Sequence, residues 1–381
     1  MIYLDHNATT PVAPEVLDAM EPFWRGHFAN PSSSSTLSRP IKRAIAQARE
    51  DCAVLFGCEP GELIFTSGGT ESLHTALHSV TLQQPQRRHL IIGSTEHEAI
   101  ISPAAWLEQS QGYEVTRLPV DPDGLISLAD LAAAIRPGQT AAIALMWANN
   151  ETGVIHPVPE AAALAAAHGI PIITDTVQTA GKIPVNLRQS GVSYAAFSGH
   201  KFHAPKGIGL LYVSRNTSFQ PCLHGGSQEN RRRAGTENTA GIVGLGAAAR
   251  LALTTQSESG EALEAMRDSF ENEVLTRIPG THRNGHPQRR VPNTSSIRFD
   301  GCQAEGLLFL LDQRGVCASA GSACTTGSLH PSHVLTAMGL DAIAARSTLR
   351  FSLSSSTTRA ELETTLTALE SSTAKFRSLI S

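Results

Sequence analysis

The chain has 381 residues, of which 41% are hydrophobic, so it can bury a large core and form two domains. Its formal net charge of -4 gives no electrostatic reason to expect nucleic-acid binding. No stretch has the roughly 18 uninterrupted apolar residues of a membrane span, and the first residues do not read as a signal peptide.

The six cysteines are thinly spread and form no Cys-x-x-Cys pair. Such usage is typical of reduced thiols in the cytoplasm and argues against a disulfide framework or a zinc site. We therefore expect a cytoplasmic protein with no metal centre.

The N-terminal part predicts a short strand at 2–5 followed by a turn, and then a helix at about 38–56. A strand at 63–66 leads through a glycine-rich turn into a helix that starts near Gly69 or Thr70. The backbone N–H groups and the dipole at the start of such a helix can bind a phosphate. The turn matches neither the dinucleotide fingerprint nor the phosphate-loop motif, and many similar turns carry Ser and Thr only as helix caps.

Strands and helices then alternate along the chain. The apolar runs predict strands at 89–93, 113–118, 140–147, 171–175 and 208–213, with helices at 98–107, 125–135 and 160–168. Nearly continuous apolar strands joined by helices indicate a mainly parallel sheet covered on both faces, which is an α/β fold.

The rest of the chain predicts a second, smaller α+β domain. After a helix at 238–254, which still belongs to the large domain, helices are expected at 260–277, 304–312 and 358–378, and strands at 294–299, 315–318 and 347–352. We place the boundary near residue 256, so that residues 15–256 form a large α/β domain. Residues 1–14 and 257–381 form the small domain, which carries a cysteine-containing loop at about 319–333.

Asp175 and Lys201 each follow a short apolar strand. If these strands are parallel neighbours, both side chains open into one crevice at the sheet edge. A lysine that forms a Schiff base and an aspartate that keeps a ring nitrogen protonated are the pair that pyridoxal 5'-phosphate requires. Taken singly, both residue types are more often solvated surface groups, and Ser198 to Lys201 also fits a Ser-x-x-Lys signature whose partner motifs are lacking.

Other polar residues also follow predicted strands. His97 comes after one strand and Asn150 after another, so four strand-end loops can contribute to one site. His97 and Glu98 begin like a zinc-binding helix, but Ile101 stands where the second histidine is required, which argues against metal ligation.

Cys324 lies in a segment dominated by Gly, Ser and Thr, which predicts a mobile loop. No apolar neighbours in the sequence would bury its thiol, so a reactive thiol is favoured over an inert core cysteine.

Ordered along the chain, these residues and their flanking motifs resemble those of the cysteine desulfurases. The resemblance runs nearly end to end and rests on YLDHNATTPV, NPSS, FTSGGTES, TEHEAI, ANNETGV, TD-x-x-Q-x-x-GK, SGHKFHAPKGIG, GGSQE, RAGTEN, GSAC and PSHVL. It implies a pyridoxal-phosphate enzyme of aminotransferase class V with transferase fold type I, in the subgroup that serves nitrogen fixation and iron-sulfur cluster assembly. Departures from the usual pattern stand at His74, Val177, Ser227, His330 and Ser354.

The resemblance implies a role for each matching residue. Lys201 would hold the cofactor and move protons, His97 would stack on its ring and assist proton transfer, and Cys324 would take the sulfur of L-cysteine as a persulfide. The other cofactor contacts would come from Gly69, Thr70, Asn150, Asp175, Gln178, Ser198, His200 and, from a second subunit, Thr236. Asn150 and Arg350 would bind the substrate carboxylate. The implied partners are a second copy of the chain and a sulfur-acceptor protein.

Two alternatives stay open at this point. A selenocysteine lyase, or another class V enzyme, could use the same scaffold without needing Cys324. A non-catalytic phosphate-binding or thiol-based scaffold could use the turn at 67–70 and Cys324, although the chain has neither phosphate-loop motif.

Overall fold

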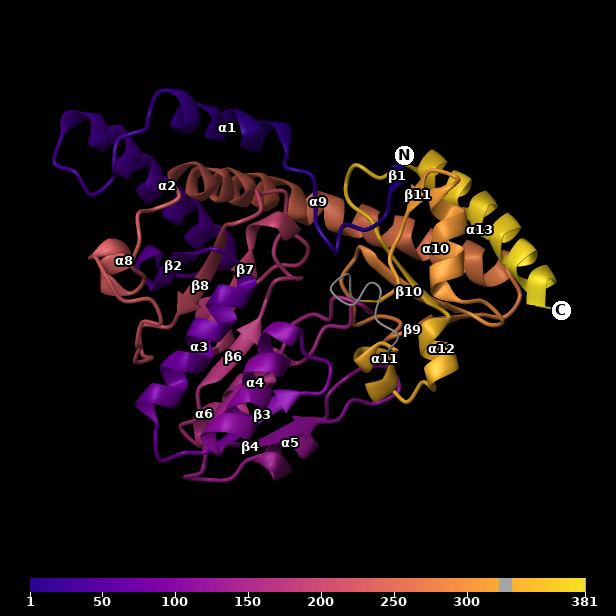
Figure 1. Cartoon of the computed structure of the whole chain (residues 1–381), viewed down its shortest axis with the longest axis horizontal. Helices are drawn as coiled ribbons and strands as arrows, with labels where there is room; N and C mark the ends of the chain where they lie inside the picture. The colour runs from indigo at the N-terminus through magenta and orange to yellow at the C-terminus, as the bar shows by residue number, and fades with distance from the viewer. Residues whose placement is uncertain (322–330, 381) are drawn as a thin grey trace.

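The computed structural model of the chain describes residues 1–321 and 331–380. Its main feature is a seven-stranded sheet with the strand order β2-β8-β7-β6-β5-β3-β4 (Figure 1). In that order the strands are β2 (Leu63–Thr66), β8 (Gly209–Val213), β7 (Tyr194–Ser198), β6 (Ile172–Asp175), β5 (Thr140–Ala144), β3 (His89–Gly93) and β4 (Glu114–Leu118). The five strands from β7 to β4 are parallel, and β8 runs antiparallel to β7 and β2. The predicted mainly parallel α/β sheet is therefore confirmed.

Helices cover both faces of this sheet. On one face the core forms against α3 (Gly69–Gln83) and α4 (Glu98–Gln111). On the other face it forms against α1 (Pro14–Arg25), α2 (Arg39–Phe56), α5 (Leu128–Ala134), α6 (Val158–Ala167) and the first part of α9 (Thr239–Arg277). Burial on both faces explains why the strands read as continuous apolar runs.

A second core lies around smaller sheets in the C-terminal part of the chain. The strands β12 (Thr348–Ser352), β10 (Thr294–Phe299) and β9 (Thr281–Asn284) form an antiparallel sheet in that order. The N-terminal β1 (Ile2–Tyr3) pairs in parallel with β11 (Val316–Cys317). The helices of this part are α10 (Ala304–Asp312), α11 (His333–Ala337), α12 (Ala342–Arg346) and α13 (Arg359–Ile380).

The structure differs from the sequence-based expectations in two helices. Residues 14–25 form α1, which begins with Pro14 at its first position, where a missing N–H costs no hydrogen bond. The separate helices expected at 238–254 and 260–277 are one continuous helix, α9. Gly260 weakens a helix by only about 1 kcal/mol, which packing at both ends can offset. The domain boundary expected near residue 256 falls inside this helix and stays a prediction.

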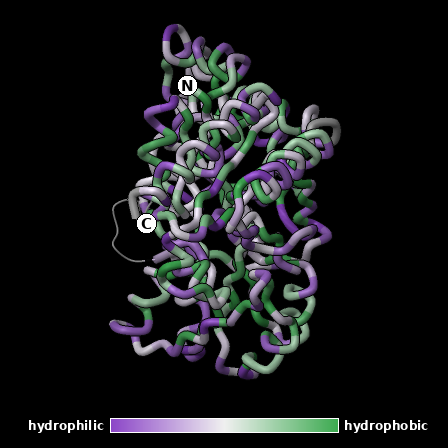
Figure 2. Tube along the Cα trace, turned by 90° about the vertical axis from the view of Figure 1, so that its right-hand side faces the viewer, coloured by the Kyte–Doolittle hydropathy of each residue, from purple (hydrophilic) through white to green (hydrophobic). Residues whose placement is uncertain are grey.

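Two short helices, α7 (Leu187–Ser190) and α8 (Gln228–Arg231), lie in connections next to the large sheet. Hydrophobic and hydrophilic segments alternate at short intervals along the chain (Figure 2). Within the described residues, no helix combines the length and hydrophobicity needed to cross a membrane.

Candidate active site

The strands that precede Asp175 and Lys201 are parallel neighbours. In the pairing of β6 with β7, Asp175 lies opposite Ala196, so both strands end at the same edge of the sheet. A cavity of about 230 Å³ opens there. The predicted site residues that line it are Gly69, Thr70, His97, Asn150, Asp175, Gln178, Ser198, His200, Lys201 and Arg350.

Two predicted residues do not join this group. Thr236 is exposed and does not line the cavity. Cys324 lies outside the described residues, so its position relative to the cavity stays a prediction.

One end of the cavity is formed by the start of α3. The residue before this helix is Gly68, which provides no side-chain cap for the first backbone N–H groups. A Cβ atom at Gly69 would lie 2.7 Å from Cγ2 of Val177 and 3.7 Å from Cβ of Ser198. Only glycine fits beside Val177, and it leaves the helix start open to an anion.

Lys201 lies at the end of a short 3₁₀ turn, Gly199–Lys201. Its amine donates hydrogen bonds to the carbonyl oxygens of Asn7 at 2.7 Å and Ala8 at 2.8 Å. The N-terminal segment thus holds the amine at the edge of the cavity.

Asp175 is buried at the end of β6. Burial raises the pKa of its carboxyl group, although the charge of Lys201 and the N–H of Val177, which donates to Oδ1 at 2.9 Å, act in the opposite direction. The ionised form therefore gains from any further positive charge that enters the cavity.

His97 precedes α4 and caps it. Its Nδ1 accepts a hydrogen bond from the N–H of Ala99 at 3.1 Å. Because a backbone N–H can only donate, Nδ1 must be unprotonated, and the neutral ring carries its proton on Nε2.

His200 is neutral at physiological pH. Burial, aided by the positive charges of Lys201 and Lys206, lowers its pKa to about 4. Its Nδ1 lies 3.1 Å from Oγ1 of Thr9.

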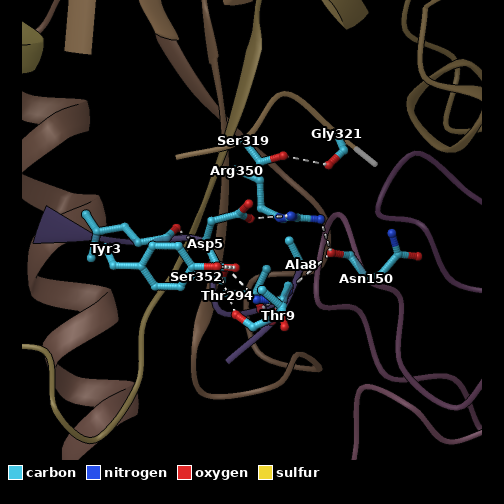
Figure 3. Close-up of polar contacts among 12 residues, drawn as sticks. Tyr3, Asp5, Ala8, Thr9, Asn150, Thr294, Ser319, Gly321, Arg350 and Ser352 are labelled. Atoms are coloured by element: carbon cyan, nitrogen blue, oxygen red, sulfur yellow. Dashed lines mark hydrogen bonds and ion pairs between the residues drawn. The ribbon is translucent and has the colours of Figure 1, made fainter. Parts of the chain in front are cut away.

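Arg350 projects from β12 into the cavity and links three parts of the chain (Figure 3). Its Nη2 lies 2.6 Å from Oδ1 of Asp5, and its Nη1 donates to the carbonyl oxygen of Asn150 at 2.9 Å. Its Nε is buried and has no hydrogen-bond partner among the residues that the structure describes. A fixed guanidinium group in this position can bind a small carboxylate.

Sequence reasoning missed three residues of this region, namely Asp5, Asn7 and Lys182. Asp5 is the ion-pair partner of Arg350, and Asn7 accepts hydrogen bonds from Lys201, Gln178 and Lys182. All three lie in the quoted motifs YLDHNATTPV and TD-x-x-Q-x-x-GK, but the motifs do not say what these side chains contact.

The comparisons with known proteins agree with this geometry. A profile of the aminotransferase class-V family matches residues 2–364. The chain is 47% identical over 366 residues to cysteine desulfurase 2 of Trichormus variabilis, covering 96% of this chain and 91% of the relative. It is 45% identical over 363 residues to cysteine desulfurase NifS of Azotobacter vinelandii, covering 95% of this chain and 90% of that relative.

Solved structures show the same relationship. A NifS-like protein superposes with a TM-score of 0.91 at 33% identity, over 97% of this chain and 98% of that one. The structure of SspA in complex with cysteine has a TM-score of 0.82 at 36% identity, over 93% of this chain and 99% of the SspA chain. The chain therefore belongs to the aminotransferase class-V family and, within it, to the cysteine desulfurases.

Proposed function

We propose that this protein is a pyridoxal-phosphate-dependent cysteine desulfurase that converts L-cysteine to L-alanine and leaves the sulfur on Cys324 as a persulfide. The net reaction balances, because the substrate thiol and the Cys324 thiol give alanine and a persulfide without another oxidant or reductant. The observation that carries the proposal is the convergence of Asp175, Lys201 and the uncapped start of α3 on one cavity.

The hydrogen-bond donors and charges of the residues around the cavity match the groups of pyridoxal phosphate. The start of α3 at Gly69 and Thr70, with Ser198 and His200, would bind the phosphate, and Asp175 would pair with the ring nitrogen. When bound, the cofactor supplies an aldehyde for Lys201 and a ring that takes up electrons from the substrate.

The remaining side chains bind and orient the substrate and move protons. Asn150 and Arg350 would hold the carboxylate of cysteine, while the amine of Lys201 would remove and return protons at the substrate carbons. His97 would lie over the ring and take the proton of the attacking thiol on Nε2. For this the ring proton must first move from Nε2 to Nδ1, which gives up the hydrogen bond from Ala99.

We also propose that the enzyme works as a homodimer in a reducing, cytoplasmic setting. Thr236 is exposed and could complete the phosphate site of a second copy, and Trp24 and Phe28 expose large apolar side chains near α1. The five cysteines among the described residues are free thiols. Light scattering should give about twice the 40.4 kDa of the chain. From the dimer, the persulfide sulfur would pass to an acceptor protein, as for iron-sulfur cluster assembly.

Substitution of the two reacting residues tests the function. Cys324→Ser should retain the visible absorbance of the bound cofactor and lose sulfide release from L-cysteine by at least about 100-fold, because an alcohol does not replace a thiolate nucleophile. Lys201→Ala should no longer be trapped as a covalent adduct by borohydride. Full desulfurase activity of Cys324→Ser, or an adduct in Lys201→Ala, would overturn the proposal.

A further inference from the structure

Lys182 is an amine beside the cavity that the proposed reaction does not use. It lies in the turn after β6, where its N–H donates to the carbonyl oxygen of Thr179 at 3.0 Å. Gly181 precedes it with φ of 70°, and a Cβ atom there would lie 3.1 Å from Cβ of Phe202. The local backbone thus aims Lys182 back toward the site.

The amine of Lys182 binds two side-chain amides through their oxygen atoms. It donates to Oδ1 of Asn7 at 2.8 Å and to Oε1 of Gln178. Burial, with the charges of Lys201 and Arg350, lowers the pKa of Lys182 well below its usual value, but the amine remains a hydrogen-bond donor in either protonation state.

This contact decides which end of the Gln178 amide faces away from Lys182. With Oε1 facing Lys182, the NH₂ group faces away from it, and Nε2 donates to the carbonyl oxygen of Asn7 at 3.1 Å. That carbonyl also accepts from Lys201.

The side-chain amide of Asn7, which also binds Lys182, is fixed in its orientation by further hydrogen bonds. Its Oδ1 also accepts from Nδ2 of Asn293 at 3.1 Å, and its own Nδ2 donates to Oγ1 of Thr294 at 2.8 Å. Asn7 is 1% exposed, so a reversed amide would leave buried donors and acceptors unmatched.

We propose that Lys182 is a positioning residue that makes Gln178 present a hydrogen-bond donor, not an acceptor, to the phenolic oxygen of bound pyridoxal phosphate. This inference rests on the proposed function. An ionised phenolic oxygen gains from an N–H donor and is repelled by an amide oxygen, so the orientation of Gln178 affects both the affinity for the cofactor and its ionisation.

The test compares Lys182→Met with Lys206→Met in the full-length protein. Methionine keeps an unbranched side chain that reaches to the position of Cε and removes the donor, while Lys206 is an exposed lysine near the same site that does not line the cavity. Titration of the apoprotein with pyridoxal phosphate should give about tenfold weaker binding for Lys182→Met, as for loss of one hydrogen bond to a charged group. Its visible absorbance should fall in favour of near-ultraviolet absorbance, and Lys206→Met should match the wild type in both measurements.

A double-mutant cycle with Gln178→Leu separates positioning from a general loss of packing. If Lys182 acts through Gln178, adding Lys182→Met to Gln178→Leu should weaken cofactor binding by less than about twofold. Additive effects of the two substitutions would overturn the inference.

Lys182→Gln provides a milder variant if methionine disturbs folding. It keeps an N–H donor without the charge, so its affinity for the cofactor should lie within about threefold of the wild type. An affinity as low as that of Lys182→Met, or unchanged binding and spectrum in Lys182→Met, would overturn the inference. Borohydride trapping of the wild type tests the proposed function separately, since a wild type that forms no adduct would instead overturn that function.

Discussion

At the scale of single residues, the guanidinium of Arg350 is fixed by contacts with two other parts of the chain. Its guanidinium is almost fully buried, pairs with Asp5 and donates to the Asn150 carbonyl, so two directions of its planar fork are already used within the protein. In the proposed reaction, a carboxylate substrate would bind to the N–H groups that remain. This arrangement suits arginine and not lysine, whose ammonium is a point charge without a fork.

We therefore expect Arg350→Lys to raise KM for L-cysteine by at least about tenfold, with a smaller change in kcat. The reason is that lysine lacks the planar fork whose separate N–H groups face Asp5, the Asn150 carbonyl and the cavity. Steady-state kinetics over a range of cysteine concentrations measure the effect. The exposed Arg346→Lys, four residues earlier, is the matched control and should keep the KM of the wild type.

At the scale of elements, the turn after β6 depends on a left-handed glycine. Gly181 has φ of 70° and close contact with Phe202. Gly112, at the end of α4, has φ of 68°, but apart from its chain neighbours no atom of the described residues would lie within 4 Å of a Cβ atom there. Alanine at either position would carry the backbone cost of a left-handed conformation. Only at position 181 would its Cβ atom also crowd a neighbour, Phe202.

Gly112→Ala should lower the free energy of unfolding by about 1 kcal/mol, and Gly181→Ala by roughly 2 kcal/mol or more. Urea unfolding measures both values. Gly181→Ala should also weaken cofactor binding, because it moves Lys182. Equal losses in the two variants would contradict the steric argument.

The segment of α8 is held by one carboxylate. Glu229, Asn230 and Arg231 all have positive φ angles, which is costly for residues other than glycine. Glu229 compensates by accepting from Nη2 of Arg49 at 2.6 Å, from Nη1 of Arg49 at 2.9 Å and from the N–H of Phe65 at 2.9 Å.

Glu229→Gln should cost about 3 kcal/mol of unfolding free energy, because it leaves the charge of Arg49 in a largely buried site without its partner. Denaturant unfolding is the measurement. Glu59→Gln, which breaks a surface pair with Arg188, is the control and should cost less than about 1 kcal/mol. A Glu229→Gln variant as stable as that control would show that other contacts hold α8.

At the scale of the whole molecule, the two cores meet along α9 and along the segment that follows β5. Val154 bridges to Arg290, and Ile155 donates its N–H to the carbonyl of Arg289. The next residue, His156, is buried, and its Nδ1 has no hydrogen-bond partner within residues 1–321 and 331–380. Burial lowers its pKa to about 4.

The lowered pKa of His156 determines the direction in which folding stability changes with pH. An unfolded histidine titrates near 6.5, so between pH 6.5 and about 4 the unfolded chain binds more protons and the folded state loses stability as the pH falls. Above pH 6.5 the contribution is fully present, and below about 4 no further loss occurs. His6 and His200, whose pKa values are also lowered to about 4, act with the same sign.

His156→Gln should therefore lose about 3 kcal/mol less unfolding free energy than the wild type between pH 7 and pH 4. Urea unfolding at several pH values tests this. The exposed His168→Gln should retain the wild-type pH dependence. If the unfolding free energy of His156→Gln fell with pH as steeply as that of the wild type, His156 would not be the source of this pH dependence.

Much of the fold and part of the site follow from local sequence. Apolar strands alternating with helices predicted the mainly parallel sheet, because strands buried on both faces need apolar residues throughout. The meeting of Asp175 with Lys201 was also predictable, since parallel neighbours end at one sheet edge. The glycine-rich turn before α3 indicated a phosphate site for the same kind of local reason.

The tertiary structure alone decided how the site is completed. Asp5 meets Arg350, and Asn7 meets Lys182, Lys201 and Thr294, across hundreds of positions in the chain. No periodicity or local propensity specifies such contacts, because they depend on β1 pairing with β11 and returning the N-terminal segment to the sheet edge. The sequence by itself therefore determined the kind of site, and the packing of the N-terminus determined how its amines, amides and guanidinium are oriented.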